Sequence, residues 1–110
     1  MSFPVSLKVL KIDVGCKPEV VEIKGLLEDM QEICGGYVEA IHIDEGYYLY
    51  VNEDGRAMEL PLNRFVNNQP ILGNIFIGKV NRATGDMETL DQDAIDLFTT
   101  IFSAKNVFLG

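Results

Sequence analysis

The sequence lacks tryptophan and has only two cysteines and one histidine among its 110 residues. A zinc site would require Cys16, Cys34, His42 and a carboxylate to converge, without the closely spaced ligand pairs that such sites usually have. Secreted domains of this size often carry several disulfides. We therefore expect two free thiols in a reducing cytosol, no metal site and no bound cofactor.

Catalytic motifs are also missing. Ser2, Ser6 and Ser103 lie near the chain ends, and none sits in the strand–turn–helix elbow of a serine nucleophile. The glycines form neither a GxxxxGK[ST] nor a GxGxxG pattern. Glu39 would be an acid with a raised pKa if it faced the core beside Ile41, but we favour an ordinary position at a sheet edge or in an ion pair. The sequence therefore predicts a protein that is not an enzyme, with no catalytic residues.

Basic residues are scarce, with 9 Lys and Arg against 17 Asp and Glu and a net charge of -8. This charge repels nucleic acid phosphates and anionic membranes, so we expect no direct nucleic acid binding and no membrane binding. No apolar run approaches the ~20 residues of a membrane-spanning helix, and the N-terminal segment does not read as a signal peptide. We expect a soluble cytoplasmic protein, whose acidic surface also allows mimicry of DNA.

Apolar residues are plentiful, at 47% of the chain, which is enough for one modest core. We therefore expect a single domain spanning residues 1–110. Alternating apolar residues predict strands at 5–14, 19–23, 37–43, 47–51, 57–60, 74–80 and 87–90. Helical spacing predicts helices at 26–34, at 61–66 and from Asp91 onward.

The order of these elements predicts an α+β fold. We expect one compact domain with a largely antiparallel sheet and two main helices packed on one face. Gly35 and Gly36 end the first helix and return the chain into the strand at 37–43. That strand has apolar residues on both faces, so we expect it in the centre of the sheet. The strand at 5–14 changes its alternation midway, which indicates a bulge or cover on both faces.

Two polar segments are the candidates for a binding site, namely VNEDGR at 51–56 and LPLNRFVNNQ at 60–69. Arg and Asn side chains suit phosphates and the edges of nucleobases, and tyrosines offer faces for stacking. The alternative is ordinary turn chemistry, because Asn and Gly also form loops. The candidate ligand-binding residues are Asn52, Arg56, Asn63, Arg64, Tyr37, Tyr48 and Glu39.

Three segments, VLKIDVGCKPEVVEIKGLLEDMQEICGGYVEAI, NEDGRAMELPLNR and ILGNIFIG, resemble an uncharacterised family of small proteins from bacteriophages, plasmids and other mobile elements. The resemblance covers residues 7–102 and implies an accessory protein in the host bacterial cytoplasm. Small accessory proteins of this kind often act by binding. The shared features fall at Gly35, Gly36, Tyr37, Glu39, Asn52, Gly55, Leu60, Pro61, Asn63, Ile71, Gly73 and Ile77.

These observations support three hypotheses. The first is a non-enzymatic binding protein that counters a host defence by sequestering a nucleotide-type signal, with a pocket at a homo-oligomer interface. The second is an acidic protein–protein inhibitor of a host defence protein or nuclease that imitates DNA. The third is a small nucleotide hydrolase that uses Glu39 and a metal ion.

Overall fold

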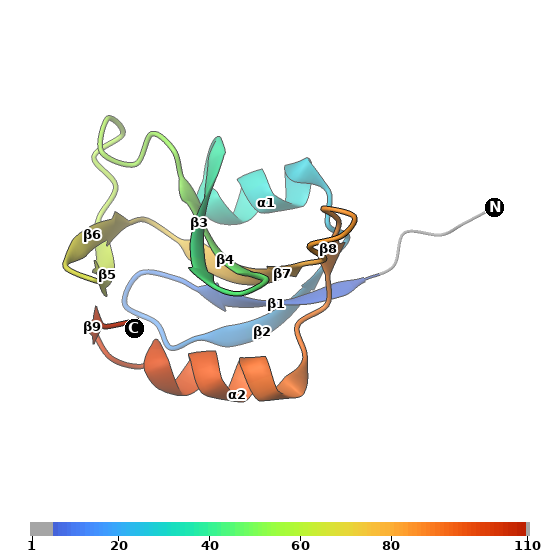
Figure 1. Ribbon diagram of the computed structural model, residues 1–110. Helices are drawn as coiled ribbons and strands as arrows, with labels where there is room; N and C mark the ends of the chain where they lie inside the picture. The colour runs from blue at the N-terminus through green and yellow to red at the C-terminus, as the bar shows by residue number, and fades with distance from the viewer. Residues whose placement is uncertain (1–5, 110) are drawn as a thin grey trace.

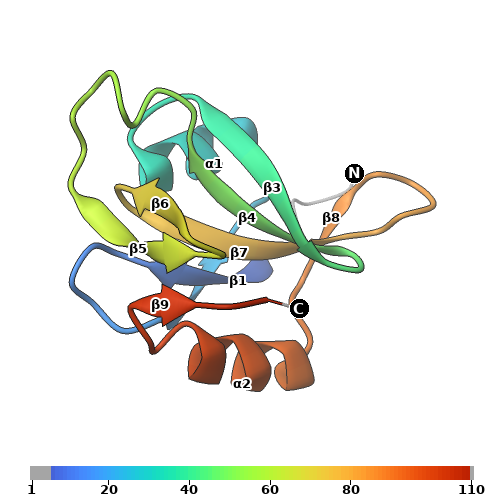
Figure 2. The same cartoon turned by 60° about the vertical axis from the view of Figure 1, so that its left-hand side comes forward.

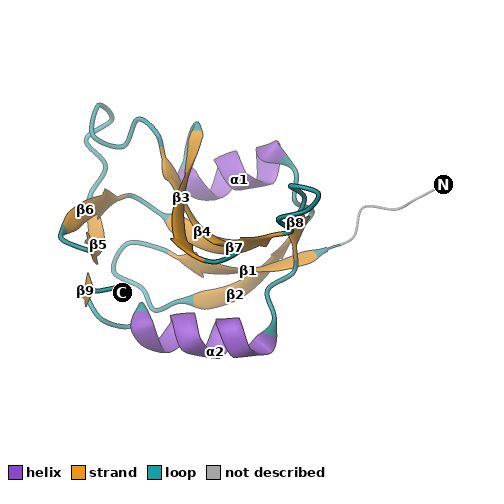
Figure 3. Ribbon diagram, in the orientation of Figure 1, coloured by secondary structure: helices purple, strands orange, loops and turns teal. Residues whose placement is uncertain are grey.

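The structure is a computed structural model that describes residues 6–109. Its centre is a main sheet in the order β2-β1-β7-β4-β3, with β8 beside β7 and every pairing antiparallel (Figures 1 and 3). The strands of this sheet are β1 (Leu7–Ile12), β2 (Glu19–Ile23), β3 (Val38–Asp44), β4 (Tyr47–Asn52), β7 (Ile75–Val80) and β8 (Met87–Glu88). The fold class is therefore α+β, as predicted.

A smaller sheet lies beside the main one, in the order β6-β5-β9 (Figure 2). It consists of β5 (Leu62–Val66), β6 (Gln69–Leu72) and β9 (Asn106–Val107). The β5–β6 pair is antiparallel, whereas β5 and β9 run parallel. Val66, Ile71 and Val107 are buried against the main sheet, so the smaller sheet helps to cover one of its faces.

The two helices, α1 (Leu27–Cys34) and α2 (Gln92–Ile101), cover opposite faces of the main sheet (Figure 1). Neighbouring residues of one strand enter different cores: Val9 packs on the α1 side and Leu10 on the α2 side, and both are fully buried. The prediction that both helices share one face is therefore wrong. Strands that are apolar at both alternations need cover on both faces, so one layer of helices does not suffice.

Three other predicted features differ. Residues 57–60 form turns rather than a strand, and residues 61–66 contain β5 rather than a helix. After β5, Asn67 and Asn68 form a tight hairpin turn with φ of 49° and 65°, and β6 begins at Gln69. The strand at 37–43 is an edge strand rather than a central one, because β3 pairs only with β4 in the described part of the chain. Ser2 and Val5 lie outside the described residues.

None of the helices within residues 6–109 is long and apolar enough to span a membrane.

Asp91, where the sequence predicts the second main helix to begin, caps α2 and also connects this helix to β4. One carboxylate oxygen accepts a hydrogen bond from the backbone N–H of Ala94 at 3.1 Å, and the other accepts from the Tyr47 hydroxyl at 2.6 Å. The amino group of Lys79 lies 3.5 Å from the same carboxylate. The Tyr47 hydrogen bond is the largest of the causes that lower the pKa of Asp91. The ionised cap therefore stabilises the folded state.

We expect Tyr47→Phe to raise the pKa of Asp91 towards the ordinary value. The substitution should also lower the free energy of unfolding by about 1 kcal/mol at neutral pH, a modest loss because the carboxylate is partly exposed. A lowered carboxyl pKa contributes stability above the unfolded pKa of about 3.9, and this contribution is lost as the pH falls through the lower folded value. The difference in free energy of unfolding between wild type and variant should therefore become smaller in acid. Carboxyl NMR titration and melting curves at each pH measure both effects. Tyr48→Phe, on the opposite face of β4, is the control, and an unchanged Asp91 titration in Tyr47→Phe would contradict the assignment.

Candidate functional site

A cavity of about 400 Å³ opens between the β1–β2 turn, β5 and the segment that follows α2. Of five cavities in the described part of the chain, this one alone contains Lys or Arg without any Asp or Glu. We call it the cationic cavity. In a protein of net charge -8, this lining concentrates positive potential in one place. Its lining residues are Val14, Gly15, Leu62, Asn63, Arg64, Phe65, Lys105 and Asn106.

Arg64 is the buried cation of this cavity, with only 6% of its surface exposed. Its Nε donates to Asn63 Oδ1 at 2.7 Å, and its Nη1 donates to the backbone carbonyls of Phe102 and, at 3.1 Å, Ala104. These carbonyls follow the end of α2, where the helix dipole favours a positive charge. Nη2 has only a long contact of 3.4 Å, to the carbonyl of Cys16. Burial lowers the pKa of Arg64. Nη2 is therefore the part of the guanidinium that is most available to a ligand.

Asn63 holds Arg64 in place rather than offering its own groups to a ligand. Its Nδ2 donates to the carbonyls of Ile12 at 2.9 Å and Gly73 at 2.8 Å, while its Oδ1 accepts from Arg64. All of these groups are buried. The side chain therefore joins β5 to the end of β1 and to the loop before β7.

Lys105 and Phe65 complete the cationic cavity, and the sequence analysis missed both. Lys105 is exposed, and Phe65 leaves 38% of its surface exposed on the outward side of the smaller sheet. Phe65 pairs with Asn106 across β5 and β9, which brings the two segments together. Phe65 could have been found from the sequence only if LNRFV had been interpreted as a strand, because alternate residues of a strand point to opposite faces.

Glu39, Asn52 and Arg56 line a different cavity of about 300 Å³, between β3, the turns after β4, and β6. We call it the β3–β6 groove. Asn52 is buried and structural: it donates to the Cys34 carbonyl at 3.0 Å and accepts from the Asp54 N–H at 2.7 Å. The lining residues are Glu39, Ile41, Val51, Asn52, Glu53, Gly55, Arg56, Gln69, Pro70, Ile71 and Leu72. Two carboxylates and one guanidinium make this groove less suitable for phosphate than the cationic cavity.

The predicted tyrosines line neither of these two cavities. Tyr37 is 67% exposed just beyond α1, and Tyr48 contacts His42 edge to face, with ring centroids 5.4 Å apart. Tyr48 and Tyr50 point to the α1 side of β4, away from Glu39 and the groove. The structure therefore separates both tyrosines from the predicted arginines. Glu39 is exposed rather than facing the core.

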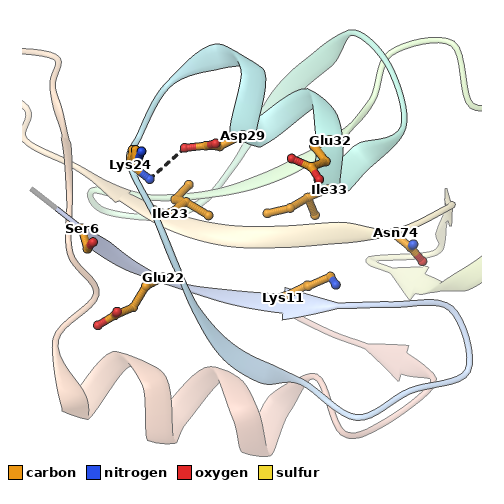
Figure 4. A pocket seen from close by; sticks show the side chains of 9 residues that line it. All are labelled: Ser6, Lys11, Glu22, Ile23, Lys24, Asp29, Glu32, Ile33 and Asn74. Carbon is orange, nitrogen blue, oxygen red and sulfur yellow. Dashed lines mark hydrogen bonds between the residues drawn. The ribbon is translucent and has the colours of Figure 1, made fainter. Parts of the chain in front are cut away.

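The largest of these five cavities, of about 540 Å³, lies beside α1 and is drawn in Figure 4. Ile23 and Ile33 point towards each other from β2 and α1, and Asp29 accepts a hydrogen bond from the backbone N–H of Lys24 at 2.8 Å. Its lining is Ser6, Lys11, Glu22, Ile23, Lys24, Asp29, Glu32, Ile33 and Asn74. Three carboxylates against two lysines again disfavour an anionic ligand, and none of the predicted site residues lies here.

Both cysteines are free thiols, as the sequence predicts. Cys34, the last residue of α1, is buried against the main sheet, and burial raises its pKa to about 12. It is therefore a neutral thiol at physiological pH. Within residues 6–109, no group of three or more His, Cys, Asp or Glu side chains is placed to hold a metal ion together.

The chain matches the family model of a domain of unknown function, DUF3846, over residues 7–103. This match includes both helices, every strand of the main sheet, and the β5 residues of the cationic cavity, while Lys105 and Asn106 lie just beyond it. No curated protein and no solved structure matches the chain. The chain therefore belongs to the DUF3846 family, whose function is unknown.

Proposed function

We propose that this protein is a non-enzymatic accessory protein of a bacteriophage, plasmid or other mobile element, and that it counters host defence in the bacterial cytoplasm by sequestering a small nucleotide-type ligand. The resemblance described for the sequence supports the context. The cationic cavity supports the ligand class, because it combines two cations, the amide side chain of Asn106 and an aromatic ring without a carboxylate. This composition is the observation on which the proposal rests.

Each part of the cavity has a role in such binding. The exposed ammonium group of Lys105 and Nη2 of Arg64 meet the phosphate, since both donate to anionic oxygens. The ring of Phe65 offers a face for stacking with a base, and the amide of Asn106 can hydrogen-bond to a base edge. A volume of about 400 Å³ lies within the range of small-molecule sites.

The lining also favours holding a ligand over transforming it. It contains no Ser, Thr, Cys, His, Asp or Glu, so it lacks the side chains that most often act as nucleophile or general base. Lys105 is exposed, whereas lysines that act as bases usually have their pKa lowered by burial. These features support sequestration.

We expect Lys105→Ala to weaken nucleotide binding about tenfold, because it removes a charge-assisted contact of about 1.4 kcal/mol. Phe65→Ala should weaken it to a similar degree through lost stacking. Isothermal titration with cyclic mononucleotides, cyclic dinucleotides and ADP-ribose measures the effect, after a thermal-shift screen has identified the ligand.

Arg56→Ala is the matched control, since it removes an exposed arginine that lines the β3–β6 groove instead. It should change affinity less than twofold if the ligand occupies the cationic cavity. The proposal fails if no nucleotide raises the melting temperature, or if Arg56→Ala weakens binding more than Lys105→Ala. Mass spectrometry of the recovered ligand should show it unchanged. Turnover that a chelator abolishes would favour the hydrolase that uses Glu39 and a metal ion.

A second candidate function is inhibition of a host defence protein or nuclease by an acidic surface that imitates DNA. Its support is the charge pattern: among the 17 acidic residues, only Asp13, Glu45 and Asp91 form ion pairs within residues 6–109. Binding to a purified host nuclease should then compete with duplex DNA and weaken steeply with salt. Binding that persists alongside bound DNA would rule out mimicry.

A further inference from the structure

The edge of β3 is an open end of the main sheet. β3 pairs with β4 on one side, and no other described strand pairs with it (Figures 1 and 2). An open edge presents unpaired backbone groups to which another chain can add as a strand. Proteins usually protect such edges, and here the protection is a register shift between His42 and Asp44. Residues 38–42 lie before this shift and keep a regular register with β4.

The backbone groups that face outward can be assigned from the pairing. The N–H of Glu53 donates to the carbonyl of Tyr37 at 2.8 Å, so these two residues form a hydrogen-bonded pair. In an antiparallel ladder such pairs alternate with pairs that direct their backbone groups away from each other. Val38, Ala40 and His42 are the alternate residues and therefore direct their N–H and C=O groups to the open side. Ala40 is small and exposed, so its backbone is accessible.

The β3–β6 groove lies beside this edge, between the Glu39 and Ile41 side chains of β3 and the strand β6. A neighbouring cavity of about 200 Å³ continues it towards the other end of β3, and the two cavities share Ile41, Gln69 and Ile71. Glu39 and Glu53 line the groove and form no ion pair with its single arginine, Arg56. The surface beside the open edge therefore combines an apolar floor with excess negative charge.

We propose that the β3 edge binds an extended, lysine- and valine-rich protein segment, which adds to the main sheet as a further strand. One row of its side chains lies along the groove, where ammonium groups meet Glu39 and Glu53 and their aliphatic stems cover Ile41. The other row packs beside Ala40 and His42. A second copy of this chain is a poor occupant, because pairing two β3 edges would bring the carboxylates of both copies to one seam.

The test uses a blocked octapeptide of alternating lysine and valine and the ¹⁵N-labelled full chain at low salt. We expect slowed hydrogen exchange at the amides of Val38, Ala40 and His42. The amides of Glu39 and Ile41 should not change, because they already bond to β4. Slowed hydrogen exchange in β2, the other edge of the main sheet, in place of β3 would overturn the proposal. A peptide that does not bind at millimolar concentration would also overturn it.

Two peptide controls separate backbone pairing from charge attraction. The same octapeptide with every backbone nitrogen methylated cannot form the ladder and should not bind. The octapeptide with glutamate in place of lysine should bind at least tenfold more weakly. Retained binding of the methylated peptide overturns the proposal regardless of how any protein variant folds.

Matched protein variants test the charge contribution. The double variant Glu39→Gln and Glu53→Gln should bind the lysine–valine peptide about fivefold more weakly, since exposed ion pairs contribute modestly to affinity. Glu19→Gln combined with Glu22→Gln makes the same change in charge on β2 and should alter affinity less than twofold. Equal effects of the two double variants would show long-range attraction only and would overturn the assignment to β3.

Discussion

Replacing Arg64 with alanine should lower the free energy of unfolding by about 3 kcal/mol, because each buried acceptor left without a donor costs about 1–3 kcal/mol. Arg64 donates to Asn63 Oδ1 and to the carbonyls of Phe102 and Ala104, and its change leaves all three without this donor. Water entering the vacated space recovers part of the loss. The midpoint of urea unfolding should fall while the slope stays unchanged.

Two substitutions serve as controls for this prediction. Arg64→Lys keeps the charge and one donor group but loses the planar fork, so it should recover about half of the stability. Arg56→Ala removes an exposed arginine whose side chain forms no ion pair within residues 6–109, and it should change stability by no more than about 0.5 kcal/mol. A loss below about 1 kcal/mol for Arg64→Ala would show that water replaces the guanidinium well.

Replacing Phe76 with alanine should lower the free energy of unfolding by about 4 kcal/mol, a typical loss when a large aromatic side chain is removed from a core. Phe76 is fully buried in β7 on the α1 side and stacks on Tyr50, with ring centroids 4.6 Å apart and planes 8° from parallel. Met30 and Ile33 of α1 pack on the same cluster. Hydrogen exchange should therefore accelerate in α1 more than in α2.

Phe65→Ala is the control, because this ring is 38% exposed and its removal should cost only about 1 kcal/mol. Phe76→Leu, which keeps most of the apolar volume, should cost about 1.5 kcal/mol. Equal acceleration of exchange in both helices would contradict an independent core beneath α1. Both Phe76 variants also test the arrangement of helices on opposite faces, since a single helical layer would leave Phe76 facing solvent.

Most of the fold follows from local patterns. The apolar alternations predict β1, β2, β4 and β7, and the helical spacing with the Asp91 cap predicts α1 and α2. The same strand patterns, apolar at both alternations, indicate cover on both faces of the sheet, and this favours helices on opposite faces. β5 was mistaken for a helix because a short apolar segment after a proline suits either structure. Asn67 and Asn68, which tolerate positive φ, were the signal for a hairpin there.

The site was predictable only in part. Arg64 and Asn63 were chosen for their hydrogen-bonding groups, and they do line the cationic cavity, but most of those groups bind the protein itself. Lys105 enters the cavity only because β9 pairs with β5 from a distant part of the sequence. No local pattern encodes that pairing. Exposure of Tyr37 and burial of Asn52 likewise depend on tertiary contacts.

The parallel pairing of β5 with β9 also sets an order of events during translation. A ribosome must have released Val107 from its exit tunnel before the smaller sheet can close, since that residue pairs with Val66. Arg64 gains its carbonyl partners from Phe102 and Ala104 at about the same moment. A nascent chain that stops before these residues contains the sequence of β1 to β7 but lacks the two carbonyl partners of Arg64, so the proposed anion site can form only after these residues have emerged.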